Sequence, residues 1–352
     1  IYRGAGVTHD DFTHHTTVGA LYADYRLNVG KWNFRAGFRY EYSYLSAKFK
    51  EQAEAHDNFS ARLHDLVPNA AISWNINDEN SLKVSYNRNI RRPGISYLDP
   101  TRSISPTAQS FGNPDLESEV YNNVSLNYSL IKSKFNLDFN LGGTLVNNSL
   151  AQVQWLENDI QYSTYANIGK RRIASMGLYF QWSINSKTRW MTNLNLTYAY
   201  MSQPSPVDAT GATVRLSRAR WNINPWTRIS RDLPWKLEAS LSGYFWTGSL
   251  NSVYSYSASS SKNIGYSISL SRKFLKDDRL TLRINANNLF GPGSSEYRSM
   301  TYNPGYYSEY VSMSNNRRYV GLSVNFRFGS LNVQVKKTAS SISNDDLSGR
   351  KK

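Results

Sequence analysis

The stretch "LTLRINANNLF" (residues 280–290) decides the fold class, because its first eight residues alternate between apolar and polar. Leu, Leu, Ile and Ala stand at positions 280, 282, 284 and 286, and Thr, Arg, Asn and Asn stand between them. Successive side chains of a β-strand point to opposite faces of the sheet. Strict alternation therefore predicts a strand with one apolar and one polar face.

The same alternation recurs along the chain. It is clear in "WNFRAGFRYEYSY" (32–44), "FNLDFNLGG" (135–143) and "IGYSISLS" (264–271). The pattern predicts an all-β protein with about thirteen strands and no helix. The predicted strands cover residues 12–28, 32–47, 64–76, 81–90, 118–131, 134–157, 160–184, 188–202, 214–230, 235–258, 261–274, 279–302 and 307–328.

The lengths of these strands point to a membrane. A strand of a soluble protein usually has about five or six residues, whereas a tilted strand crosses a bilayer in about ten and then extends beyond it. No window approaches the roughly 20 apolar residues of a spanning helix. A soluble β-sandwich or propeller would also alternate, but one whole side of its large sheets would have to be solvated. A wide antiparallel up-and-down barrel with a wet lumen meets this requirement.

The connections between the predicted strands fall into two classes. Short ones rich in Gly, Asn, Asp and Lys suit tight hairpins, and the others are often longer, as at 47–62, 91–117 and 202–213. Outer-membrane barrels place short turns in the periplasm and longer loops outside. Aromatic residues that follow short turns are expected to form a girdle at one membrane interface: Trp32, Phe135, Trp190 and Trp235.

Charge and cysteine content exclude several classes. The formal net charge of +15 invites a nucleic-acid interpretation, but the basic residues are spread over strand faces and turns, so no nucleic-acid partner is expected. A barrel that faces anionic lipopolysaccharide tolerates such a charge. The absence of cysteine excludes disulfides, Cys-based metal sites and thiol catalysis.

The sequence contains few candidate catalytic groups. Asp10, Asp11, His14 and His15 lie together, but neighbouring strand residues point to opposite faces, and the two acids are expected in an exposed loop. His56 and His64 have no patterned partners, and no common catalytic or nucleotide-binding motif occurs. The run "GKRR" (169–172) is interpreted as a solvated face rather than an anion site. We expect no enzyme, no cofactor and no metal.

The stretch "YNRNIRRPGISYLDPTRSISPTAQSFGNPDLESEVYNNVSLNYSL" (86–130) resembles the C-terminal barrel of TonB-dependent outer-membrane receptors. It is most similar to the outer-membrane β-barrel family of Bacteroidetes type, where the run reads approximately RRP, then LNP, then GNPxLxPE. Ser118 replaces the second proline of the last element, and Asp99 takes the Asn position of the middle one. The matching residues are Arg91, Arg92, Pro93, Leu98, Pro100, Gly112, Asn113, Pro114, Leu116 and Glu119.

The chemistry of these residues suggests a strand end and a folded loop. Pro93 cannot donate to a ladder, and Pro114 restricts Asn113 to extended geometry. We expect Arg91 and Arg92 to pair with Glu119 where the loop folds back into the lumen.

The resemblance also implies a domain organisation. Residues 1–328 would be the C-terminal part of a barrel of about 22 strands, incomplete at its N-terminus, and ending with "YVGLSVNFRF" (319–328). Residues 329–352 are polar and are expected to form a disordered periplasmic tail. The chain opens at Ile1 without Met or a leader, so we expect a fragment or processed product, with upstream residues supplying more strands and a plug domain. A smaller complete barrel with an even strand number is the alternative.

The function implied by the resemblance is TonB-dependent uptake of a scarce solute, such as a glycan, siderophore, cobalamin or peptide, across the bacterial outer membrane. The expected partners are outer-membrane lipids, lipopolysaccharide, a plug domain, the TonB system and a surface lipoprotein. Tyr302, Tyr306 and Tyr307 are candidate ligand contacts near a loop tip. The alternatives are a passive or structural barrel, a surface adhesin without transport, and a soluble carbohydrate-binding protein.

Overall fold

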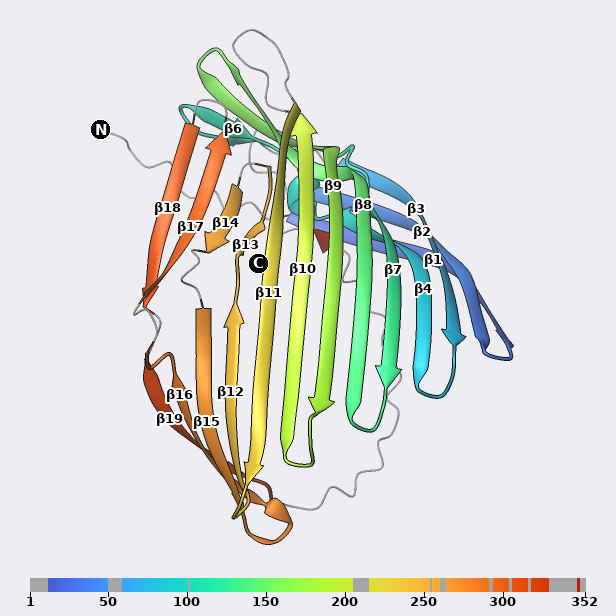
Figure 1. Cartoon of the computed structure of the whole chain (residues 1–352). Helices are drawn as coiled ribbons and strands as arrows, with labels where there is room; N and C mark the ends of the chain where they lie inside the picture. The colour runs from blue at the N-terminus through green and yellow to red at the C-terminus, as the bar shows by residue number, and fades with distance from the viewer. Residues whose placement is uncertain are drawn as a thin grey trace.

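The computed structural model describes residues 12–49, 59–100, 102–204, 215–253, 255–259, 264–290, 294–303, 306–315, 318–328 and 347–348. Thirteen strands follow one antiparallel path in sequence order (Figure 1). They are β1 (Phe12–Val29), β2 (Trp32–Phe49), β3 (Phe59–Asn75), β4 (Asn80–Pro93), β7 (Glu119–Ile131), β8 (Phe135–Glu157), β9 (Ile160–Ser183), β10 (Thr188–Pro204), β11 (Arg215–Leu233), β12 (Leu237–Phe245), β15 (Ile264–Phe274), β16 (Leu280–Asn287) and β19 (Tyr319–Phe326). This confirms the predicted antiparallel barrel sheet.

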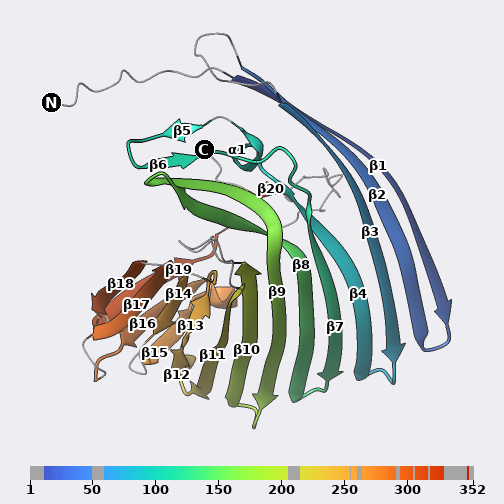
Figure 2. The same ribbon diagram turned by 90° about the horizontal axis from the view of Figure 1, so that it is seen from above.

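The path bends into an open arc, as Figure 2 shows from above. The connection between β4 and β7 lies on its concave side and contains α1 (Ile95–Leu98), β5 (Ser103–Ile104) and β6 (Ala108–Ser110). β6 pairs in parallel with β9. The short β20 (Leu347–Ser348) pairs in parallel with the end of β4; the rest of the predicted tail lies outside the described residues.

The two faces of the sheet differ as the alternation predicts. The convex face carries exposed apolar side chains: Val84, Val124, Leu141, Trp221, Leu241, Ile268, Ile284 and Leu322. The concave face carries a polar ladder. In it Ser85 bonds to Ser125 at 2.8 Å, Ser129 donates to Asp138 at 2.7 Å, and Thr144 donates to Asn123 at 2.8 Å.

Three of the last four predicted strands are wrong in extent. Residues 235–258 do not form one strand: β12 ends at Phe245, and β13 (Gly248–Leu250) and β14 (Ser255–Ser259) form a hairpin. Residues 279–302 divide into β16 and β17 (Ser294–Asn303), and residues 307–328 divide into β18 (Tyr306–Asn315) and β19. Residues with positive φ adjoin two of the breaks: Gly248, at 111°, begins β13, and Asn288, at 51°, follows β16. β13, β14, β17 and β18 form a second, four-stranded sheet.

Aromatic rings gather at the end of the sheet that carries the short turns, which we call the short-turn end; the other is the long-loop end. Trp32 stacks on Trp74 with a centroid separation of 5.2 Å, and Phe180 meets Trp190 edge to face at 4.9 Å. The expected residues Phe135 and Trp235 lie at the same end, and Trp235 occupies a turn with positive φ. Paired aromatic residues therefore mark this end.

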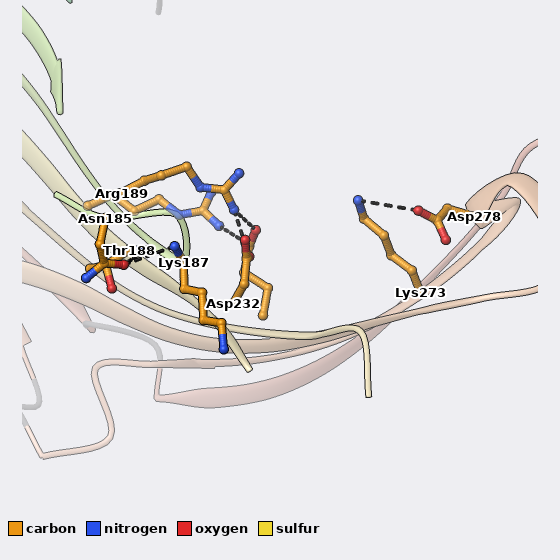
Figure 3. A network of polar contacts seen from close by, with 9 residues as sticks. Asn185, Lys187, Thr188, Arg189, Asp232, Lys273 and Asp278 are labelled. Carbon is orange, nitrogen blue, oxygen red and sulfur yellow. Dashed lines mark hydrogen bonds and ion pairs between the residues drawn. The ribbon is translucent and has the colours of Figure 1, made fainter. Parts of the chain in front are cut away.

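Ion pairs also connect the hairpins at the short-turn end (Figure 3). Arg189 contacts Asp232 at 2.9 Å and Glu238 at 2.8 Å, which joins β10, β11 and β12. The hydrogen bond from Lys236 is the main reason why the pKa of Asp278 lies below its usual value. This contact therefore favours folding at neutral pH and is lost as the pH falls through that lowered pKa. Because the pairs are exposed, each contributes little alone.

The opposite environments of the two faces predict opposite responses to charge. Leu194 and Asn195 are neighbours in the middle of β10, on the convex and concave faces respectively. We expect Leu194→Arg to lower the free energy of unfolding by about 2–4 kcal/mol, because the guanidinium would face lipid. The matched Asn195→Arg should change it by less than about 1 kcal/mol. Chemical unfolding of the full-length protein in lipid vesicles measures both, and equal effects would contradict a lipid-facing convex surface.

Candidate functional site

The concave face becomes apolar near the long-loop end of β2 and β3. The buried residues there are Leu45, Ala47, Phe59, Ala61 and Leu63. They form one core cluster with Leu98 of α1 and Leu116 of the returning loop, which are 0% and 2% exposed. Burial of each leucine contributes about 1.5–3 kcal/mol. The 94–118 segment, which we call the anchored loop, is thus held against the wall by its own leucines.

The "GNP" turn fixes the middle of the anchored loop. Gly112 and Asn113 donate their backbone N–H groups to Asp99 and Tyr97 carbonyls, each at 2.7 Å. A Cβ at Gly112 would lie 2.5 Å from the Asp99 carbonyl oxygen, so only glycine permits this approach. The Asn113 side chain donates to the Tyr165 carbonyl on β9 at 2.9 Å. The turn therefore joins α1 to the β8–β9 hairpin.

The return to β7 is held by buried side chains. Ser118 donates to Asp65 of β3 at 2.8 Å. Glu119, 4% exposed, accepts hydrogen bonds from Ser149 Oγ at 2.9 Å and from the Leu150 N–H at 2.7 Å. Ser118 stands where the pattern that this segment resembles has its second proline, and its hydroxyl provides a contact that proline would lack.

The buried arginine of the motif pairs differently from the prediction. Arg92 is 1% exposed and forms an ion pair with Glu41 of β2, which Arg39 also contacts. Among the described residues, no ion pair joins Arg91 or Arg92 to Glu119, so the predicted pairing is wrong. Arg91 lies opposite Glu119 in the β4–β7 ladder, but Glu119 is taken up by Ser149 and Leu150. Arg92 instead reaches Glu41 of β2.

The remaining motif residues occupy the edges of the anchored loop. Pro93 is buried at the end of β4, and Pro100 and Pro114 are half-buried. Glu41 and Asp65 were not among the predicted site residues. Both lie on the polar face of an alternating strand, yet the exposed fraction is only 7% for Glu41 and 6% for Asp65. Acidic residues at the long-loop end of that face were the available signal.

The concave wall also contains a groove of about 380 Å³ nearer the short-turn end. Its polar side chains come from five neighbouring strands, β4 to β10: Ser81, Lys83, Asn127, Ser129, Asp138, Asn140, Tyr179, Asn193 and Asn195. Amide and hydroxyl groups of this kind bind polar surfaces or water. The groove is therefore suited to a polar occupant of the lumen.

The other candidate residues are only partly described. Tyr302 lies opposite Tyr307, and Asn303 opposite Tyr306, at the end of the β17–β18 hairpin; the tyrosine side chains lie outside the described part. Asp10, Asp11 and His56 are also outside it. Among the described residues, no group of three His, Asp or Glu is placed to hold a metal ion. No described helix is long and apolar enough to cross a membrane.

Comparison with known proteins fits this geometry. The outer membrane protein beta-barrel family matches residues 5–327. The chain belongs to this family. An outer-membrane location follows for the barrel and agrees with its apolar convex face. Among curated protein sequences, none matches the chain.

Solved structures share the fold of this barrel. One is the siderophore receptor PiuA from Acinetobacter baumannii, with a TM-score of 0.60 and 19% identity over 90% of this chain and 44% of that one. Another is the FrpB iron transporter from Neisseria meningitidis, with a TM-score of 0.57 and 13% identity; the match covers 90% of this chain and 45% of that one. A third is the ferric-catecholate import receptor Fiu from E. coli, with a TM-score of 0.58 and 12% identity; the match covers 90% of this chain and 45% of that one. The chain thus spans less than half the length of these proteins, and the likeness concerns the fold alone.

The close approach at Gly112 predicts the effect of adding one methyl group. Gly112→Ala should lower the free energy of unfolding of the full-length barrel by about 1–3 kcal/mol, because the Asp99 and Tyr97 carbonyls must move. The anchored loop should then become open to protease. Gly143→Ala is the control, since a Cβ there meets no atom within 4 Å. Thermal unfolding and limited proteolysis in detergent measure both variants; a Gly112→Ala barrel as protease-resistant as the parent would contradict this role for the turn.

Proposed function

We propose that this chain is the C-terminal barrel portion of a TonB-dependent outer-membrane receptor that takes up a scarce solute. One observation carries the proposal. The sheet has a polar concave face and, in the described part, β1 and β19 each pair on one side only. Lipid offers no hydrogen bonds to an open sheet edge, so further strands are needed to close the barrel. The match to about half of each longer receptor or transporter supports this.

The proposal assigns a place to the partners. A barrel of about 22 strands is wide enough to require a plug in its lumen. The polar groove between β4 and β10 offers the plug hydrogen-bonding groups. The short-turn end would face the periplasm and TonB, and the long-loop end would face lipopolysaccharide, the solute and a surface lipoprotein. Residues 329–352 would extend into the periplasm, and a Bacteroidetes-type bacterium would be the source.

Binding and transport are proposed rather than catalysis. The described residues present a polar wall and an anchored loop, and the family and the similar structures are those of barrels, receptors and transporters. The glycan, siderophore, cobalamin and peptide classes remain the candidate solutes.

Loss of TonB tests the energy source. Deletion of the full-length gene should abolish growth on at least one limiting nutrient from a panel of glycans, ferric siderophores, cobalamin and peptides. Deletion of the TonB gene should abolish growth on that same nutrient, because the plug would no longer be opened. A growth phenotype that survives the loss of TonB would favour a passive barrel or an adhesin.

The same growth assay tests the tyrosines at the hairpin end. Replacement of Tyr302, Tyr306 and Tyr307 with Ala should raise the nutrient concentration needed for half-maximal growth about tenfold, as loss of aromatic contacts worth about 1.4 kcal/mol would. Tyr198→Ala, on the same convex face of β10 as Leu194, is the control. Unchanged growth of the triple variant, with normal amounts of barrel in the membrane, would remove these residues from the ligand path.

A further inference from the structure

A second cavity lies at the long-loop end, beside the anchored loop. It has a volume of about 180 Å³ and is formed by β8, β9, β10 and the connection between β13 and β14. β8 is irregular there, because its register with β9 shifts between Val146 and Ser149 and again before Ala151. An extra residue of this kind bends a strand and changes the direction of its side chains. Ser149 lines the cavity and donates to Glu119 of the motif.

A buried donor in this cavity lacks an acceptor. Gln203 lines the cavity, is 9% exposed, and its Nε2 has no hydrogen-bond partner in the part of the chain that is described. Its neighbours Met201, Ser202 and Val253 are equally buried. Buried amide groups of native proteins are nearly always paired. The cavity therefore offers a hydrogen bond that an acceptor from outside this wall would complete.

A cation faces the same cavity. Arg171 borders it on the same face of the sheet as Met201 and Gln203, and it forms no ion pair with a described residue. The adjacent Lys170 also borders it, but its exposed side chain points to the other face. In the strand register Arg171 lies opposite Met201, which lies opposite Arg218, so arginines of β9 and β11 share this face on either side of β10. Glu119 contacts the lining through Ser149, but Ser149 and Leu150 already donate to it. Among the described residues, the unpaired groups on this face of the cavity are therefore the Gln203 amide donor and the Arg171 guanidinium.

We propose that this cavity binds an oxyanion, namely a carboxylate or phosphate group of the solute that enters the barrel. A carboxylate or phosphate supplies both the missing acceptor for Gln203 and a counter-charge for Arg171. The volume suits one charged group, since sites for whole ligands measure about 300–1,000 Å³. The run "GKRR" is thus more than a solvated face: the bulge in β8 and the end of β10 turn part of it into a binding wall.

The inference that the anion belongs to a transported solute rests on the proposed uptake function. Anion binding itself can be measured without transport. The full-length protein in nanodiscs of neutral phosphatidylcholine is titrated calorimetrically with inorganic phosphate and with citrate. We expect saturable binding of at least one anion. Arg171→Gln should abolish it, and Lys170→Gln, which removes an exposed cation from the opposite face of the same strand, should leave it unchanged.

Gln203→Leu separates a binding role from a structural one. It removes a buried donor without a partner, so the melting temperature should stay the same or rise, while the affinity for the anion should fall at least tenfold. Nanodiscs that contain phosphatidylglycerol distinguish the sources: competition with phosphate identifies a lipid headgroup, and no competition identifies a free solute. The proposal is overturned if neither anion binds saturably, or if Gln203→Leu binds as tightly as the parent. Neither result depends on TonB.

Discussion

Each strand of this sheet meets lipid on one face and water on the other, and the rest of the structure depends on that constraint. Leu194 and Asn195 are neighbours in β10, yet they require opposite solvents. Because the side-chain period of a strand is two, a slip of one residue would bring every apolar group to the wet face. The register is therefore fixed by solvation along the whole arc, and little continuous core is needed.

The exception to that rule identifies the region with a specific structure. On β2 and β3 the concave face turns from polar to apolar at Leu45 and Leu63, where Leu98 and Leu116 cover it. The pair of Arg92 and Glu41 lies beside this cluster and is buried as well. Buried ion pairs add little net stability, but breaking one is costly, so they specify a single arrangement. Here the pair and the leucines determine where the chain leaves β4.

The sequence predicted the regular part of the fold because alternation is local. The boundaries of β1, β2, β8 and β9 follow from it within a few residues. It did not predict the breaks after Phe245 and Asn287, where backbone geometry interrupts an otherwise suitable pattern. Glu41 and Asp65 were missed because their partners lie about 50 residues away along the chain. Local patterns indicate which face a side chain occupies, but not which distant loop covers that face.

The motif and the anion cavity are connected through one side chain. Glu119 ends the motif, begins β7, and accepts hydrogen bonds from Ser149 and Leu150 at the bulge in β8. Those two residues also line the cavity that contains Gln203 and Arg171. The contacts that hold the anchored loop thus also fix the shape of the cavity wall. A segment identified as a structural signature of the family would then act in binding, because it positions the irregular strand from which the cavity is built.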